Sequence, residues 1–436
     1  MRELTPTMAH HPTLACPRCG RQRGAAALVV TMLLFFAMVL VAVFANRSLV
    51  FEQRTSANQY RSTQAFEAAE AGLEWALAQL NGNAAIGDDC MPSTAPGATS
   101  FRARVLHADV ARATFTPVTW LNNGLPMALQ PSCVRGASGW SCSCPTQGQP
   151  VLAAPLGNEP APAFTLQFQA GARPGSIRVV STGCTRLAGA CVPGATTTVD
   201  ATARVQIDLA LLPALRTPPA ATLTARGAVN AGNAPIGLRN ADPTTGIAVQ
   251  AGGAITAAQA RLTAPAGSPP STLLLGNDTA LAGLTPDRFF ASYFGLDKAT
   301  WRDLPVAIKV DCRAPCAAAL QAAIAAAPGN AMVWVDGDLA LTGPLTLGSD
   351  QAPVVIVVTG SAQFDGAVVV NGLLYAGSLS WDNTSGPGAL LRGALITEAG
   401  YQGNGAPDLV YDTQVLAALK GTSGTFARVS GSWRDF

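Results

Sequence analysis

Residues 25–45 read AAALVVTMLLFFAMVLVAVFA, a run of 21 residues with no charge, no proline and no glycine. As a helix this run is about 30 Å long, which is the thickness of the hydrocarbon core of a bilayer. A long helix that is apolar on every side is typical of a membrane span rather than of a soluble core. Arg18, Arg21 and Arg23 precede the run and Arg47 follows it, so we expect the N-terminus in the cytoplasm and the chain beyond residue 46 outside.

The helix is expected to continue well beyond the span. Between residues 25 and 80 there is no proline and a single glycine, Gly72, so nothing in the sequence ends the helix at the membrane surface. We therefore expect one helix over residues 25–80, about 80 Å long. Its last part has an apolar residue at every third or fourth position, which predicts a stripe that packs against a globular domain. The stripe consists of Phe66, Ala69, Leu73, Ala76, Leu77 and Leu80.

The composition limits what the exported part can do. A chain of 436 residues has room for two or three domains, and 49% hydrophobic against 12% charged residues excludes a disordered chain. A net charge of +2, without a basic block, argues against nucleic acid as a partner. His10 and His11 precede the span and only His107 follows it, so a Ser/His/Asp triad or a Cys/His pair in the exported part would have to use His107, and no zinc site of several histidines can form there. We expect no cofactor and no metal.

The four residues before the apolar run, RQRG, resemble the end of a type IV prepilin leader. In that family a dedicated peptidase cuts after the glycine on the cytoplasmic side and methylates the new N-terminus, while the hydrophobic segment is retained. The resemblance implies a leader over residues 1–24, with Gly24 as its last residue and Ala25 as the first mature residue. Cys16 and Cys19 in this leader look like half of a zinc ribbon, but the chain has no second CxxC pair.

Residues 51–73, FEQRTSANQYRSTQAFEAAEAGL, are similar to the segment after the membrane helix in PilX-type minor pilins. In that family Glu-Glu-Arg-Met-Ala-Gly-Asn precedes Ala-Phe-x-Ala-Ala-Glu-Ala; this chain departs at Gln53 and at residues 55–57. The resemblance implies an α+β fold, in which the long helix packs on an antiparallel sheet. It also implies as partners other minor pilins, the major pilin, the prepilin peptidase, the inner membrane and a tip adhesin. The family-motif positions on the helix are Glu52, Arg54, Asn58, Phe66 and Glu70.

The fifth mature position would be Val29. Most pilins of this family have a glutamate there, whose carboxylate meets the N-terminal amine of a neighbouring subunit. A buried ammonium without a counter-charge is costly, which makes this chain a poor candidate for the repeating body of a fibre and favours the tip. PilX-type pilins and the large tip pseudopilin of type II secretion share this feature.

Short strands with alternating polarity follow the helix and predict a pilin-like β domain over residues 81–211. Residues 164–168 and 199–209 alternate apolar and polar side chains, as half-buried strands do. Eight cysteines lie beyond the span, and an even number in an exported region predicts disulfides. We expect Cys184 to pair with Cys191 and Cys312 with Cys316, whereas Cys142 and Cys144 are too close together to share one bond and are expected to pair with Cys90 and Cys133 in either order.

A proline-rich break at residues 213–219 marks the expected start of a second domain over residues 212–436. Short apolar runs there alternate with glycines, several of them six residues apart, which favours a β-solenoid; a β-sandwich with glycine-rich hairpins is the alternative. A helical insertion is expected to interrupt this all-β domain, with helices at residues 285–294 and 316–327.

These features together predict a minor pilin that primes or caps the tip of a type IV pilus and presents an adhesive surface. The protein would lie in the inner membrane, with its C-terminus in the periplasm, before assembly and at the pilus tip afterwards. A tip pseudopilin of type II secretion and a membrane-anchored polysaccharide-active exoprotein are the alternatives. For the last, the candidate acid and base are Asp336, Asp338, Asp365 and Asp382, but aspartate beside glycine or asparagine is common in turns, so we expect no enzyme.

Overall fold

The computed structural model describes residues 23–153, 161–187, 191, 201–312, 316–327, 329–382 and 388–436. The expected leader, with Cys16 and Cys19, therefore lies outside the described residues, apart from its last two positions. The chain divides into two compact units, Met1–Tyr60 and Arg61–Phe436. The described part of the first unit is entirely helical.

The expected long helix is present as α1 (Arg23–Leu80), which has 58 residues. It is the one helix of the described chain that is long and apolar enough to cross a membrane. Within the second unit its last turns belong to a hydrophobic core: Ala69, Leu73, Ala76 and Leu80 are buried, and Phe66 and Leu77 pack against them. The predicted apolar stripe is therefore the packed face of the helix.

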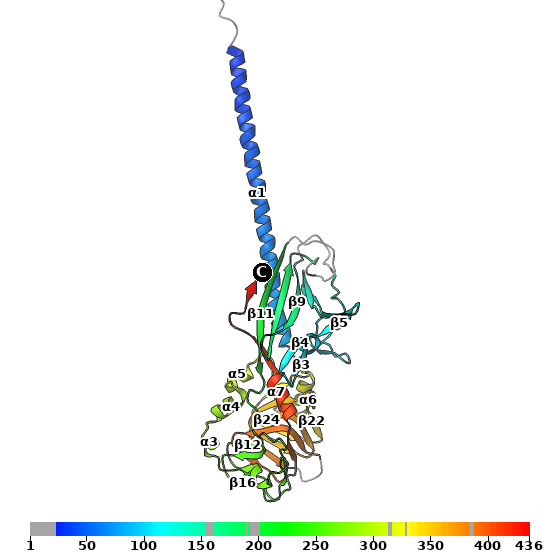
Figure 1. Cartoon of the computed structure of the whole chain (residues 1–436), viewed down its shortest axis with the longest axis vertical. Helices are drawn as coiled ribbons and strands as arrows, with labels where there is room; N and C mark the ends of the chain where they lie inside the picture. The colour runs from blue at the N-terminus through cyan, green and yellow to red at the C-terminus, as the bar shows by residue number, and fades with distance from the viewer. Residues whose placement is uncertain are drawn as a thin grey trace, which may run out of the picture. The chain divides into compact units, whose positions relative to one another are not determined.

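The second unit begins with a seven-stranded sheet against which the end of α1 packs (Figure 1). All of its described pairings are antiparallel, and Val205, Ile207 and Leu209 point into the core, as their alternation predicts. The strands are β7 (Ser132–Gly136), β8 (Gly139–Ser143), β9 (Ala163–Ala170), β10 (Ser176–Cys184), β11 (Thr202–Pro213), β28 (Gly424–Arg428) and β29 (Arg434–Asp435).

Smaller elements surround this sheet. Three two-stranded pairs and one short helix precede it in the chain: β1 (Ala85–Ile86) with β2 (Thr99–Ser100), β3 (Leu106–Asp109) with β4 (Thr114–Pro117), β5 (Thr119–Asn122) with β6 (Leu125–Ala128), and α2 (Phe101–Val105). Phe101 and Phe115 from these elements extend the core beneath α1.

The C-terminal end of the chain returns to the first sheet. Strand β11 ends at Pro213, the first residue of the expected break, and β28 pairs with it from Leu209↔Arg428 to Pro213↔Gly424. Residues 214–423 are thus inserted between two neighbouring strands, whereas the sequence predicts a domain that continues to residue 436. The physical reason is that Phe426 is buried in the core of the first sheet, where it contacts Phe115.

The inserted region contains a sheet of 16 strands, and all of its described pairings are parallel. The strands are β12 (Ala221–Ala225), β13 (Val229–Asn230), β14 (Gly237–Arg239), β15 (Ile247–Ala251), β16 (Ile255–Thr256), β17 (Arg261–Thr263), β18 (Leu274–Leu275), β19 (Ala307–Asp311), β20 (Met332–Asp336), β21 (Leu339–Thr342), β22 (Leu345–Leu347), β23 (Val354–Asp365), β24 (Val368–Asp382), β25 (Leu390–Thr397), β26 (Tyr401–Gln402) and β27 (Asp408–Tyr411).

The parallel pairings form three ladders. The first ladder runs β18-β15-β12-β25-β24-β23-β20-β19, the second runs β16-β13-β26-β24-β23-β21, and the third runs β17-β14-β27-β25-β24-β22. Each ladder places a row of apolar side chains in one shared core; in the first it includes Leu223, Leu395, Leu374 and Ile356. Because the three ladders share long strands, they curl around this core.

Helices α3 (Thr279–Ala282), α4 (Pro286–Phe294), α5 (Lys298–Arg302) and α7 (Thr413–Gly421) cover the outer side of the first ladder. The other two, η2 (Pro270–Leu273) and α6 (Cys316–Ala325), contribute Leu273 and Leu320 to the core that the ladders share. The helix expected at residues 285–294 is present as α4, which begins with a cap: the Thr285 side chain accepts from the backbone N–H of Arg288, and Pro286 is the first helical residue. Phe290, Trp301 and Tyr375 meet in the core between these helices and the ladder. Burial on both sides explains the unbroken apolar run of residues 354–358.

Candidate functional site

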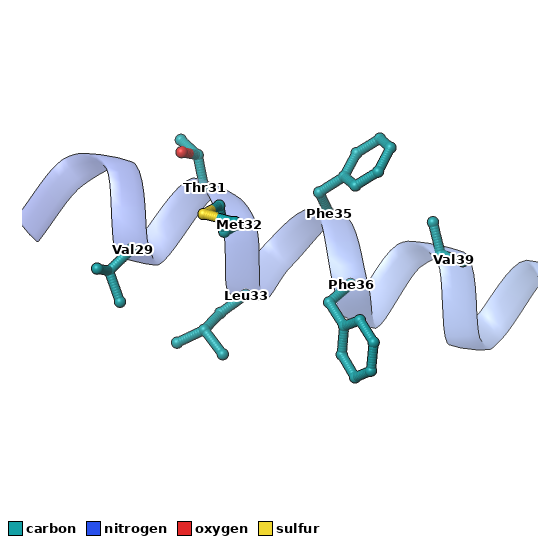
Figure 2. Close-up of a pocket in the computed structure, with 7 residues that line it drawn as sticks. All are labelled: Val29, Thr31, Met32, Leu33, Phe35, Phe36 and Val39. Carbon is teal, nitrogen blue, oxygen red and sulfur yellow. The ribbon is translucent and has the colours of Figure 1, made fainter.

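The first half of α1 is the largest uncovered apolar surface in the described chain. Every side chain from Gly24 to Tyr60 is exposed, with exposed fractions from 42% at Val39 to 77% at Phe44 among the large apolar residues. Figure 2 shows Val29, Phe35 and Phe36 projecting in different directions around this helix. Apolar surface of this extent is stable only in a bilayer or against other helices.

Within residues 24–45 of this surface, the one polar side chain is internally satisfied. Thr31 Oγ1 donates to the carbonyl oxygen of Leu28 at 2.9 Å, so it carries no unpaired donor into an apolar surrounding. No charged side chain lies between Gly24 and Asn46. This part of α1 can therefore enter hydrocarbon without a desolvated charge.

Gly24 lies in the first turn of α1, where the fold gives no reason for a glycine. A Cβ atom built on Gly24 meets no atom within 4 Å. Glycine inside a helix costs about 0.5 to 1 kcal/mol relative to alanine. Gly24 and its neighbour Ala25 are both exposed, so packing within this chain determines neither residue.

Gly72, the other glycine of α1, is fixed by packing on the sheet. Its Cβ would lie 2.3 Å from Ser181 Oγ and 2.9 Å from Cδ2 of Phe164. On the facing strand, a Cβ on Gly183 would lie 2.1 Å from the carbonyl oxygen of Ala65. Helix and sheet therefore approach each other through small residues. The position of Gly72 on the same helix face as the apolar stripe indicates a close contact with the sheet. The sequence does not show which residues it meets, because Phe164 and Ser181 are far away in the chain.

The family-motif residues fall in two environments. Glu52, Arg54 and Asn58 are exposed in the first unit, and no partner side chain contacts them in the described residues. Phe66 is half-buried, and its ring meets the Trp433 ring edge to face at 6.2 Å in the second unit, while Glu70 is exposed. No hydrogen bond or ion pair joins any two of the five motif side chains in the described residues, although Arg54 and Asn58 lie one helical turn apart, as do Phe66 and Glu70.

A buried polar cluster joins the first sheet to the inserted region, and the sequence analysis missed it. Asn81 accepts from the backbone N–H of Phe426 at 2.7 Å and donates to its carbonyl oxygen at 2.9 Å. Asn330 makes the same pair of bonds with Gly424, at 2.8 and 3.2 Å. The side chains of Asn81 and Asn330 therefore form hydrogen bonds with the backbone of β28 in the way that a neighbouring strand would. Asparagines that follow a helix resemble ordinary loop residues, so their pattern carried no signal.

Arg102 completes this cluster without an acidic partner. It donates to the carbonyl oxygens of Leu80 at 3.0 Å and Gly424 at 2.7 Å, and its guanidinium lies 4.8 Å from the centre of the Phe426 ring. Burial lowers the pKa of Arg102 to about 10, because the charged form loses its hydration. A buried cation bonded to two elements holds them in one arrangement.

All eight cysteines beyond the span are paired. Cys184 bonds to Cys191 and Cys312 to Cys316, as the sequence predicts. Cys144 bonds to Cys90 and Cys142 to Cys133, so the two neighbouring cysteines have different partners, and the order that the sequence left open is settled. Three of the four bonds lie in the pilin-like part.

Of the four aspartates considered for catalysis, Asp365 and Asp382 lie opposite each other on β23 and β24, and Asp338 and Asp382 accept hydrogen bonds from their surroundings. Asp338 Oδ1 accepts from the backbone N–H and the hydroxyl of Ser361, at 2.7 and 2.9 Å, and these bonds lower the pKa of Asp338. A general acid needs a raised pKa. Asp382 accepts from the backbone N–H of Asn404 at 3.0 Å. Both carboxylates thus have the turn-stabilising role that aspartate commonly has.

Metal ligands are likewise not gathered in the described residues. Among them, no group of three or more His, Cys, Asp and Glu side chains is placed to hold an ion. His107, the histidine beyond the span, is exposed on β3.

The comparison that bears on the family concerns α1. No curated protein matches the chain. Among solved structures, the chain is similar to the competence-associated pilin ComZ from Thermus thermophilus, at 16% identity over 86% of this chain and 97% of that one, with a TM-score of 0.21, too low to bear on the fold. A family model described as PilX N-terminal matches residues 23–74. The chain therefore carries the PilX N-terminal segment, a pilin-type start, at residues 23–74.

Proposed function

We propose that this chain is a minor pilin that primes or caps the tip of a type IV pilus. The observation that carries the proposal is the division of α1: its first half is apolar and uncovered, and its second half is part of the core of an exported domain. A plain membrane anchor needs no such continuous helix. A subunit that is held in the membrane and then extracted into a helical fibre needs such a continuous helix, because the same helix must exchange contacts with lipid for contacts with neighbouring helices.

Cleavage after Gly24 is part of the proposal. A Cβ atom at this position would meet no atom, so packing within the chain does not require a glycine there. A peptidase that accepts only a residue without a side chain would account for the glycine. The mature chain would then begin at Ala25 with a methylated amine.

The place at the tip rests on Val29. This position lies on the uncovered surface of α1 and offers no carboxylate to the amine of a neighbour. Inside a fibre the amine of the next subunit would be buried without a counter-charge, which is costly. At the tip no such neighbour exists. Other minor pilins and the major pilin are the proposed helix partners.

We interpret the three parallel ladders as a β-solenoid that would stand on the pilin-like part and present a surface for adhesion. The stacked rows of apolar side chains support this interpretation. The hydrogen bonds of Asp338 and Asp382 support a binding or structural role rather than an enzymatic one. Before assembly the protein would lie in the inner membrane with this region in the periplasm.

Replacing Gly24 tests the proposal. In the native host, Gly24→Ile should leave the leader attached, so that the protein is longer on a gel and its N-terminal sequence begins at Met1 or Met8, and it should be absent from sheared pili. Ala37→Val, in the same uncovered helix, is the matched control and should be processed normally. If Gly24→Ile and the native chain have the same mobility and the same N-terminus, and neither is found in sheared pili, the protein is an anchored exoprotein and not a pilin.

A further inference from the structure

The outer side of the second ladder carries an uncharged polar row. In the register of the strands, Gln363 lies beside Ser380, Ser380 beside Gln402 and Gln402 beside Asn230. Gln363, Gln402 and Asn230 are exposed, and Ser380 is half-buried between its two neighbours. Parallel neighbours are about 4.8 Å apart, so the row offers one hydroxyl or amide group at each such step.

This row lines a groove of about 450 Å³. Small residues, Ala228, Ala399 and Gly400, widen the groove beside the row, and Ser361 and Ser378 add two further hydroxyl groups. No Lys, Arg, Asp or Glu side chain is among the residues that line it. Amides and hydroxyls both donate and accept hydrogen bonds, so the lining matches a ligand that is rich in hydroxyl groups.

The outer sides of the other two ladders have a different character, which distinguishes this row from ordinary solvated surface. Helices cover the outside of the first ladder. The third carries charged side chains that neutralise each other: Asp408 bonds to Arg261 at 2.8 Å and to Arg239 at 3.2 Å. The outer side of the second ladder, in contrast, combines an open groove with an uncharged lining.

The charges around the groove disfavour an anionic ligand. Asp338 lies beside the row and is bonded to Ser361, one of the lining residues. Asp365 and Asp382 lie opposite each other, two positions beyond Gln363 and Ser380 on the same strands. Carboxylates at both borders would repel phosphate, nucleic acid or an acidic polysaccharide.

From this match of charge and hydrogen-bonding groups, we infer that the second ladder is a binding site for a neutral polysaccharide, whose successive sugar units contact successive strands. The inference names the ligand of the adhesive surface and rests on the proposed function only for bringing that surface outside the cell. Gln363 and Gln402 are the central binding residues, because they flank Ser380 and have no protein partner in the described part of the chain.

Binding is tested with the full chain in a zwitterionic detergent, since sugar-based detergents would compete. The probes are dextran, cellohexaose, chitohexaose and maltohexaose, with heparin and hyaluronan as anionic counterparts, measured by calorimetry. We expect saturable binding of at least one neutral probe. The double variant Gln363→Ala/Gln402→Ala should weaken it by about tenfold or more, because two hydrogen-bonding side chains are lost.

Two further variants keep the result interpretable. Ser380→Ile fills the middle of the groove without adding charge and should abolish binding, while Gln351→Ala/Gln414→Ala removes two exposed amides elsewhere and should leave it unchanged. All variants should unfold at the native temperature. Failure of every neutral probe to bind, preference for an anionic probe, or equal binding by the groove variants would refute the inference. Normal piliation with no glycan binding would leave the proposed pilus function intact.

Discussion

Gly183→Ala should separate the long helix from its sheet. Gly183 lies on β10, where an added Cβ would be 2.1 Å from the carbonyl oxygen of Ala65 and 2.4 Å from the backbone nitrogen of Ala69. Real Cβ atoms essentially never come within 3.0 Å of another heavy atom. Both obstacles are backbone atoms of α1, so no side-chain rotation can relieve them, and the whole helix must shift.

The expected loss of folding stability depends on which atoms must move to make room for the added Cβ. Overpacking a core costs about 1 to 3 kcal/mol, and more where nothing can yield, so we expect Gly183→Ala to lower the free energy of unfolding by about 3 kcal/mol. Gly72→Ala should cost less, about 1 kcal/mol, because Ser181 can rotate away and alanine improves the helix by about 1 kcal/mol. Gly24→Ala meets no atom and should not destabilise the chain.

The assay is urea unfolding of the full chain in detergent, without reductant, followed by tryptophan fluorescence. Trp75 on α1 reports the helix and sheet contact directly, since its ring centre lies 5.9 Å from that of Phe164 on β9. The reasoning predicts the order Gly183→Ala, Gly72→Ala, Gly24→Ala, from the largest loss to none. A loss below about 1 kcal/mol for Gly183→Ala, or an equal loss for Gly24→Ala, would show that the two elements do not pack as described.

Three further changes have defined outcomes. Asn81→Ala leaves the N–H and carbonyl of Phe426 unpaired and should cost about 2 to 4 kcal/mol in urea unfolding, whereas an unchanged midpoint would contradict the strand-like role of Asn81. Replacing Cys90 and Cys144 by serine opens a link across 54 residues and should cost about 4 kcal/mol; a loss below about 1 kcal/mol would contradict this. Burial raises the pKa of Tyr293 to about 12, above its unfolded value of about 10, so the stability that depends on its protonated form is complete below pH 10 and declines between about pH 10 and pH 12. Tyr293→Phe should make that decline shallower in unfolding experiments across this range, and an identical profile would contradict the assignment.

The sequence predicted those helices and strands whose own residues alternate between apolar and polar with a clear period. The stripe of Phe66, Leu73 and Leu80 is visible in the sequence because helical residues three or four apart share a face. The alternation of Val205, Ile207 and Leu209 is equally visible in a strand that is half-buried. The disulfide between Cys184 and Cys191 could be predicted because seven residues separate its ends. Each of these predictions depends on neighbours in the chain.

The missed features depend on residues that are distant in the chain. The groove brings Asn230, Gln363, Ser380 and Gln402 together only because three ladders share long strands, and no spacing in the sequence encodes that register. The same holds for Asn81, whose partner Phe426 is 345 residues away. In the sequence, Asn81 resembles a loop residue, because its role as a hydrogen-bonding partner of β28 is visible only in the folded structure.

The return of β28 changes how the inserted region is attached. Because Pro213 and Gly424 are paired, the region leaves and re-enters the first sheet at one point and has two covalent links instead of one. Asn330 and Arg102 bond to the same Gly424, so the base of the insertion is tied to both α2 and the sheet. A tail joined by one linker would turn freely about it. Two adjacent chain connections that are held together by buried hydrogen bonds resist such rotation. A force on the inserted region is therefore transmitted to the first sheet and, through the close contact at Gly183, to the packed half of α1.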